Sequence, residues 1–232
     1  MRRSTLIVTA ALVLSAASRL TAAPLTVSSY DMLNGAGVAS SGSFNYWDLS
    51  YTGAGATNVD SAPLSGGLGD LTDGVIPALN WINTENVAGT GPYVGWRNAV
   101  TPNPVVTFRF LLPVFLDSIT VYVDDSNGLG GVSPPASVDI GNAGGPYTNF
   151  VTADPGGGAP LSYTFTGLNF SGSAFDIRFN NLNEWVFVSE VTFDGEVSAV
   201  PEPSSLLTLA GGLGLAAVAI RRHMVRLSGR SS

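Results

Sequence analysis

Cysteine is absent from all 232 residues of the chain. Without thiols the protein can form no disulfide framework, no thiol nucleophile and no thiolate metal site. If the protein works in an oxidising compartment, its stability must therefore come from packing or from a bound metal ion.

Histidine and lysine are almost as scarce as cysteine. The single histidine is His223, near the C-terminus, and there is no lysine. Ser-His-Asp and Cys-His catalysis and His-ligated zinc are therefore excluded from the long central part of the chain. Carboxylate pairs, as used in glycoside hydrolysis, are the only catalytic groups left. Asp124 and Asp125 lie in an expected turn, where aspartate serves local hydrogen bonds, and no other acid stands out. We therefore expect no enzyme activity.

Positive charge is concentrated at the two ends of the chain. Between Pro24 and Val200 only Arg97, Arg109 and Arg178 stand against 16 of the 17 acidic residues, a formal charge of −13. Phosphate binding needs a basic surface, so a nucleic-acid partner is excluded. Cations, neutral glycans or a cation-bridged polyanion suit this charge better. The alternative is that the charge only keeps the surface soluble.

The N-terminus has the three parts of a secretory signal peptide. Two arginines are followed by an apolar segment, 6–17, and by the small residues Thr-Ala-Ala at 21–23. The apolar segment is too short to be a membrane span of its own. This pattern predicts a signal peptide over residues 1–23, in a helical form, cleaved after Ala22 or Ala23.

The C-terminus also has three parts in a fixed order. Pro201 and Pro203 fix the backbone and remove two donors, so this segment is extended. An uncharged apolar run follows at 206–220, and then come the arginines, beginning with Arg221 and Arg222. The run is shorter than the roughly 20 residues of a stable span, but flanking serines and a snorkelling arginine would let it just cross. A single transmembrane helix is therefore predicted over 205–220, with a basic tail at 221–232. An ordinary membrane anchor is the alternative, and a buried core helix is disfavoured because the run is apolar all round.

This C-terminal order, Val200-Pro201-Glu202-Pro203, apolar helix and arginine cluster, resembles the PEP-CTERM sorting signal of Gram-negative-type bacteria. The resemblance covers residues 199–232. It implies recognition by an exosortase, a membrane-embedded cysteine transpeptidase that would cut near Glu202. It also implies a host that makes extracellular polysaccharide. The product would be exported across the inner membrane to the cell surface or extracellular matrix, with a transient or permanent C-terminal membrane anchor.

The central residues, 24–198, are numerous enough for one exported domain with a core. No segment shows a convincing helical period, and short alternating runs recur between turn residues. We expect a loop at 53–69 and a strand end at Pro113. Strands are expected at 25–30, 44–51, 105–112, 116–123, 136–140, 150–151, 161–165, 174–179 and 185–193. This predicts an all-β fold, a jelly-roll β-sandwich of about eight to nine strands.

A second resemblance rests on the order of short motifs. These are Leu71-Thr72-Asp73-Gly74, Tyr93-Val94-Gly95-Trp96, the strand at 105–110, the segment 135–140 and the strand at 185–191. Together they look like the galactose-binding-like jelly roll shared by discoidin (coagulation factor type C) domains and many carbohydrate-binding modules. The resemblance covers about 67–195, and the segment Tyr30 to Gly66 has no obvious counterpart in it.

That resemblance implies a structural Ca²⁺ ion. Asp73 and Glu190 would supply carboxylates, and backbone carbonyls near Asp70 and Leu71 would add oxygens. Ca²⁺ takes six to eight oxygen ligands, so the donor set is chemically sensible. The alternative is that Glu190 pairs with an arginine or faces water.

A sugar site needs an aromatic face and polar groups around it. Candidates in expected loops are Trp81, Asn83, Tyr93, Arg97 and Tyr147, with Asn98 and Trp185 behind them. Trp81 is the most favoured, because asparagines and a glutamate surround it. The alternative for each aromatic is core packing, and the resemblance places Trp96 and Trp185 at positions that are usually buried.

These observations predict an exported, exosortase-processed protein that is a non-catalytic carbohydrate- or polysaccharide-binding module. The alternative is a structural matrix or adhesin protein without a defined small ligand. A glycan hydrolase is the third reading, and it would need two acids across a cleft.

Overall fold

The computed structural model describes residues 22–38 and 42–198 of the chain. Contacts divide the chain into two units, Met1–Glu196 and Val197–Ser232, and the account below concerns the first. The expected signal peptide before residue 22, transmembrane helix and basic tail lie outside the described residues. Within the described ranges, no helix has the length and apolar character needed to span a membrane.

The described part of the chain is all-β, as predicted, with nine strands and only short helical turns. The helical turns are α1 (Trp81–Thr84) and two 3₁₀ turns, η2 (Asp70–Thr72) and η3 (Leu129–Gly131). The strands are β1 (Ala23–Leu25), β2 (Ser29–Leu33), β3 (Pro63–Gly67), β4 (Val94–Arg97), β5 (Val105–Val123), β6 (Ser137–Asn142), β7 (Thr148–Val151), β8 (Leu161–Asn180) and β9 (Trp185–Val197).

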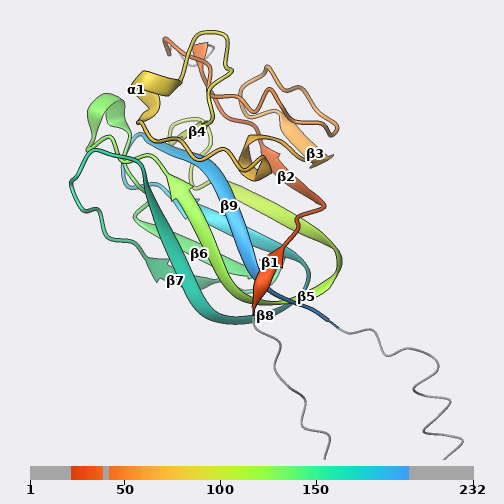
Figure 1. Ribbon diagram of the computed structural model, residues 1–232. Helices are drawn as coiled ribbons and strands as arrows, with labels where there is room; N and C mark the ends of the chain where they lie inside the picture. The colour runs from red at the N-terminus through yellow and green to blue at the C-terminus, as the bar shows by residue number, and fades with distance from the viewer. Residues whose placement is uncertain (1–21, 39–41, 199–232) are drawn as a thin grey trace, which may run out of the picture. The chain divides into compact units, whose positions relative to one another are not determined.

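All nine strands belong to one open sheet rather than to two separate ones. The main path runs β1-β9-β5-β8-β6-β7, while β2 joins β5 and β3, and β4 joins β9 (Figure 1). The jelly-roll topology therefore remains a prediction, since hydrogen bonding alone gives a single continuous sheet.

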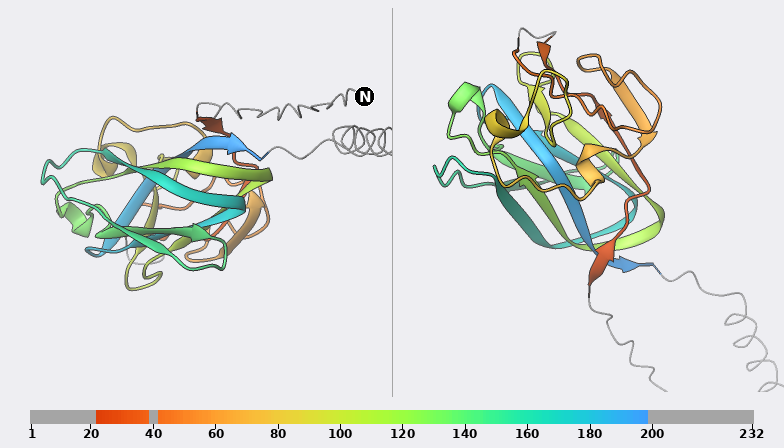
Figure 2. Two further views of the ribbon diagram at one scale, coloured as in Figure 1. Left: turned by 90° about the horizontal axis from the view of Figure 1, so that it is seen from below. Right: turned by 45° about the horizontal axis from the view of Figure 1, so that its top comes forward.

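The two longest strands, β5 and β8, bend together and give the sheet its shape. Their antiparallel register is interrupted between Arg109 and Val114, where β5 has more residues than β8. Pro113 lies in this interruption, so the prediction that it ends the strand is wrong. A proline without an N–H is tolerated at a bulge because no ladder bond is lost there. Figure 1 shows both strands curving at the end of the domain where β1 and the end of β9 lie, and Figure 2 shows that end from two further sides.

Both halves of the bent strands face one hydrophobic core. Phe108 and Phe110 from the first half and Ile119 and Val121 from the second are buried in the same cluster. Phe110 packs edge-on against Phe193 with ring centroids 5.3 Å apart. The alternation expected for β5 is thus confirmed except at Leu112, which is exposed.

Both tryptophans expected in buried positions are buried. Trp96 is inaccessible to solvent and its Nε1 donates to the carbonyl of Leu33 over 2.6 Å. Trp185 is also buried. Each aromatic therefore serves packing, as the resemblance implied.

Three segments were assigned wrongly from the sequence. The expected strand at 44–51 is irregular, because its backbone bonds go to different partners: Asn45 donates to Asn86, and Tyr46 donates to Ala36. The expected loop at 53–69 contains β3, and β4 was not expected as a strand. In all three segments, hydrogen bonding to residues distant in the sequence determines the secondary structure.

The packing of β9 on β5 makes a testable prediction. A Cβ added at Gly195 would collide with the backbone carbonyl oxygen of Phe115, whereas one added at Gly157 would meet nothing within 4 Å. Gly195→Ala should therefore lower the free energy of unfolding by about 1–3 kcal/mol, and Gly157→Ala should not. Denaturant unfolding of both variants would measure this, and equal stabilities would contradict the placement of β9.

Candidate functional site

The favoured sugar-site residue, Trp81, lies in an aromatic cluster rather than on an open surface. Its ring meets Phe44, Tyr46 and Phe187 edge-on with centroids 5.7 to 6.1 Å apart. Its backbone N–H donates to Asp124 over 2.6 Å, while its buried Nε1 has no protein partner. Trp81 is thus half-buried and serves mainly to hold α1 on the sheet.

The other sugar-site candidates near α1 also have partners within the protein. Tyr93 is buried, its hydroxyl donates to the carbonyl of Leu79 over 3.2 Å, and burial raises its pKa well above the usual range. Arg97 forms a 2.6 Å ion pair with Glu184. Asn83 is exposed and its amide donates to Asn80. Of these candidates only Asn83 is freely accessible.

Asn98 and Trp185, the weaker candidates, lie beside Arg97. The exposed Asn98 donates its backbone N–H to the carbonyl of Glu184, and the Arg97 guanidinium lies 6.0 Å from the Trp185 ring. The structure therefore groups Arg97, Asn98 and Trp185, but the indole of Trp185 is buried.

Tyr147 is the aromatic candidate that the structure leaves open. Its side chain is 36% exposed, and the guanidinium of Arg178 lies 4.7 Å from its ring centroid. Its hydroxyl donates to Asp176 over 3.3 Å. Arg178 is held in place because its Nε donates to Asp139 over 2.8 Å. A cation over an aromatic ring is a favourable contact, so this pair is fixed before any ligand arrives.

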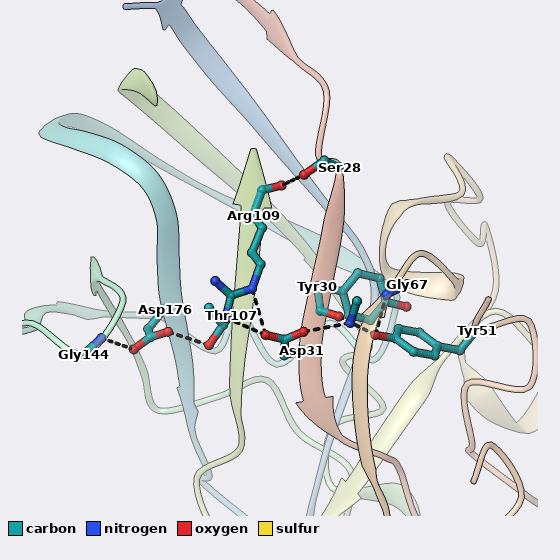
Figure 3. A network of polar contacts seen from close by, with 10 residues as sticks. Ser28, Tyr30, Asp31, Tyr51, Gly67, Thr107, Arg109, Gly144 and Asp176 are labelled. Carbon is teal, nitrogen blue, oxygen red and sulfur yellow. Dashed lines mark hydrogen bonds and ion pairs between the residues drawn. The ribbon is translucent and has the colours of Figure 1, made fainter. Parts of the chain in front are cut away.

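Polar side chains continue from Tyr147 across the outer surface of the sheet. Strand register places Asp176 of β8 opposite Thr107 of β5, and Thr107 opposite Asp31 of β2. Thr107 donates to Asp176 over 2.6 Å, and Arg109 donates twice to Asp31, over 2.7 and 2.8 Å (Figure 3). We call this surface the polar sheet face. Its members are Asp31, Thr107, Arg109, Asp139, Tyr147, Asn149, Asp176 and Arg178.

The polar sheet face mixes charges of both signs. It carries two of the three arginines between Pro24 and Val200. Burial alone would raise the pKa of Asp139, but hydrogen bonds from Asn149, Asn180 and Arg178 outweigh burial and hold that pKa below its usual range. The face therefore presents fixed donors and acceptors with little net charge. Sequence reasoning found Tyr147 but missed its partners, which only the register brings together.

The expected Ca²⁺ residues lie in a cluster of carboxylates around η2. Asp70 is buried and accepts a hydrogen bond from Ser50 over 2.5 Å, and Ser50 also reaches Asp48 over 3.1 Å. Burial, and then the charge of Asp48, raises the pKa of Asp70 to about 7. Asp48 is itself buried and accepts the hydroxyl of Tyr30. Asp48 was missed because its segment was expected to be an ordinary strand.

The other expected metal residues meet at Gly74. Glu190 is buried and accepts the backbone N–H of Gly74 over 2.8 Å, so its partner is not an arginine. Burial, and then the charge of the exposed Asp73, raises the pKa of Glu190 to about 7. Glu190 also lines a cavity of about 420 Å³ between β1, β9 and the segment around Leu68.

The carboxylates here form two pairs: the expected Asp70 with Asp48, which the sequence did not indicate, and the expected Asp73 with Glu190. Leu71, whose carbonyl was expected to supply a ligand, is buried in η2. We call the four carboxylates the acidic cluster. Among the described residues, no group of three acids is placed so that it could hold a metal ion.

Two more buried acids lie near α1. Glu85 accepts the backbone N–H of Tyr93 over 3.0 Å, while its second oxygen has no protein partner. Burial raises the pKa of Glu85 to about 8 and that of Asp124 to about 6. The turn expected at Asp124 and Asp125 is confirmed, since Asp125 accepts the N–H of Asn127 and Asp124 accepts the hydroxyl of Ser126.

These buried acids predict a pH-dependent stability. An acid with a raised folded pKa keeps protons that the unfolded chain has already released above about pH 4, so stability falls as pH rises through the folded value. For Asp70 and Glu190 that window ends near pH 7. The free energy of unfolding should therefore fall between pH 5 and pH 8.

Glu190→Gln should make that fall smaller, because glutamine can still accept the Gly74 N–H but does not ionise. Asp154→Asn, in an exposed loop, serves as the control and should leave the fall unchanged. Denaturant titrations at several pH values would measure both. An unaltered pH dependence in Glu190→Gln would count against the buried state of that carboxyl.

Comparisons with known proteins identify two parts of the chain. The family model of the "Discoidin domain-containing receptor 1/2, DS-like domain" matches residues 26–126, and that of the "PEP-CTERM protein-sorting motif" matches residues 199–222. The first match includes Tyr30 to Gly66, so the expectation that this segment lacks a counterpart is wrong. The second contains Pro201, Glu202, Pro203, Arg221 and Arg222, which lie outside the described residues. No curated protein matches the chain.

Several solved structures resemble parts of the chain weakly. A family 89 glycoside hydrolase from Clostridium perfringens is 14% identical over 47% of this chain and 12% of its own length, with a TM-score of 0.33. The family 32 carbohydrate-binding module (CBM) of C. perfringens NanJ, solved with galactose, is 11% identical over 44% and 75%, with a TM-score of 0.32. The lectin domain of lectinolysin, solved with Lewis B antigen, is 12% identical over 44% and 70%, with a TM-score of 0.33.

The chain spans only about one eighth of the glycoside hydrolase. With such low TM-scores, none of these likenesses defines the fold or the ligand of this chain. The family models are the firmer finding, and they agree with both resemblances seen in the sequence. Residues 26–126 are thus similar to a discoidin DS-like domain, and residues 199–222 match the PEP-CTERM protein-sorting motif.

Proposed function

We propose that this is an exported surface or matrix protein whose domain binds carbohydrate, without catalysis, through the polar sheet face. One observation carries the proposal: Tyr147 is an exposed aromatic ring already fixed by Arg178 and surrounded by hydrogen-bonding groups. Sugars bind where an aromatic side chain packs on the ring and fixed polar groups reach its hydroxyls.

The charge of the face favours a neutral glycan. Arg109 and Arg178 are each paired with an aspartate, so neither is a free cation for a uronate. The domain around them carries a strong negative charge that repels polyanions. Neutral sugar hydroxyls, which both donate and accept, match the alternating donors and acceptors of the face.

The absence of catalysis is proposed from the state of the acids. A glycoside hydrolase needs two carboxyl groups facing the substrate, one of them ready to give a proton. On the polar sheet face Asp139 and Asp176 already accept bonds from arginine, asparagine and threonine. The acids with raised pKa values, such as Glu85 and Glu190, are buried elsewhere.

The sorting motif supports export and surface association, and it implies processing by an exosortase. In this proposal the run 206–220 crosses the membrane at least until the tail is cut. A structural matrix or adhesin role without a small ligand is the alternative, favoured by the acidic surface. It becomes the leading one if no glycan binds.

We also propose that the acidic cluster takes a structural Ca²⁺. Its donors are one pair of carboxylates, Asp73 and Glu190, with backbone carbonyls near Asp70 and Leu71, and oxygen donors of this kind suit Ca²⁺. What supports the proposal is that Arg97, Arg109 and Arg178 form their ion pairs with Glu184, Asp31 and Asp139, all outside the cluster. A bound cation would favour the ionised forms that burial now disfavours.

The glycan proposal predicts the effect of one substitution. Tyr147→Ala should weaken binding to a neutral polysaccharide roughly tenfold or more, about 1.4 kcal/mol. Tyr122→Ala, on the second half of β5, is the control and should bind like the wild type. Affinity electrophoresis against a panel of neutral polysaccharides, with alginate as the acidic comparison, would measure this. Loss of binding in Trp81→Ala but not in Tyr147→Ala would move the site to the α1 end.

The Ca²⁺ proposal predicts a change in thermal stability. Added Ca²⁺ should raise the melting temperature above that in a chelator, because a ligand that binds only the folded state stabilises it. It should also reduce the fall in stability between pH 5 and pH 8. Asp73→Asn should lose both effects, whereas Asp154→Asn should keep them. Equal melting temperatures in Ca²⁺ and in chelator would contradict the proposed Ca²⁺ site.

A further inference from the structure

We propose that an exposed apolar patch at the bend of β5 rests on the membrane surface while the tail of the chain is still anchored. The patch consists of Leu111, Leu112 and Phe115, and the inference rests on the membrane anchor of the proposed function. The partner is a zwitterionic lipid bilayer.

The patch is unusual because three large apolar side chains lie outside the core within five residues. Leu111 is 87% exposed, Leu112 47% and Phe115 52%. Leu111 and Phe115 occupy outward positions of the alternation along β5, whereas Leu112 is outside because the register of β5 and β8 is broken between Arg109 and Val114. Clustered apolar exposure of this kind is typical of a contact surface, unlike single exposed residues.

The patch lies at the end of the domain from which the chain leaves toward the sorting motif. Gly195 of β9 packs directly against the backbone of Phe115, and the exposed Val197 follows two residues later. Figure 1 shows the end of β9 beside the curved part of β5 and β8. The patch therefore belongs to the same end of the domain as the exit of the chain.

The sequence after Val197 keeps this end close to a membrane. Only residues 198–205 separate Val197 from the apolar run at 206–220. A fully extended chain covers at most about 3.6 Å per residue, so these residues reach about 30 Å. If the run spans the bilayer, the patch is held within reach of its surface. Apolar side chains at that distance gain by entering the interface, where their exposed area leaves water.

The charge around the patch selects the kind of lipid. Asp117 lies two residues from Phe115, and Asp194 and Glu196 flank Gly195, which packs against Phe115; the domain as a whole is strongly acidic. Anionic headgroups would repel this surface at low ionic strength. Contact is therefore expected on phosphatidylcholine and weaker contact on vesicles rich in phosphatidylglycerol.

The absence of native cysteine allows a direct test. In the exported chain, 23–232, Leu111→Cys and Val151→Cys each give one site for an environment-sensitive fluorophore. Val151 is 82% exposed on β7, so it matches Leu111 in exposure and differs in position. With the chain in phosphatidylcholine vesicles, the label at 111 should shift to the blue and be quenched by a lipid-borne quencher. The label at 151 should behave as it does in water.

The outcomes separate the patch from the anchor. If the chain sediments with vesicles but the label at 111 stays in water, the patch proposal is wrong and the anchor stands. If the chain does not sediment with vesicles, both fail. A blue shift that grows with protein concentration without lipid would assign the patch to a second copy of the chain and overturn the bilayer as its partner. Stronger contact on anionic vesicles would contradict the charge argument.

Discussion

The pairing of β5 with β8 is the constraint on which the rest of the domain depends. The two strands stay in register along both halves and lose it together at the bend. Because the bend turns both halves toward the same core, Phe108 and Val121 from opposite halves of β5 can share one cluster. The same register sets Thr107 beside Asp176 on the outside, so the core and the polar sheet face are two sides of one pairing.

Features of the fold that depend on local sequence pattern could be predicted from the sequence. Features that depend on pairing between distant segments could not. The strands β5 and β9 could be predicted because apolar and polar residues alternate along them, and this polarity indicates which side chains face the core. Pro113 was misread because a bulge that accommodates proline depends on the partner strand, which the sequence does not display. Tyr147 could be named from its chemistry alone. Arg178 and Asp176 could not, since they lie about 30 residues away and only the β6, β7 and β8 pairings bring them to Tyr147.

The acids show how one residue type takes two roles in the same domain. On the polar sheet face, Asp31 and Asp139 are paired with arginines, and although burial alone would raise the pKa of the buried Asp139, its hydrogen bonds hold that pKa below the usual range. In the acidic cluster, Asp70 and Glu190 have backbone or hydroxyl partners only, and burial raises their pKa values to about 7. The first arrangement presents a ligand surface that stays the same over the neutral range. The second makes the fold sensitive to protons or to a cation, so the two groups of acids respond to different conditions.

The two proposed contact surfaces both include β5, and they differ in the polarity of the outward-facing residues of that strand. In its first half β5 keeps strict alternation, so its outward residues Thr107 and Arg109 are polar and tied to neighbouring strands. Beyond Arg109 the outward residues of β5 are apolar, and Leu111 and Phe115 are exposed at the bend. A glycan surface needs fixed polar groups, and a membrane contact needs exposed apolar ones. A single bent strand supplies both, and the apolar part lies at the end from which the sorting motif continues. The domain would then meet lipid at that end while its sheet face stays open to a glycan.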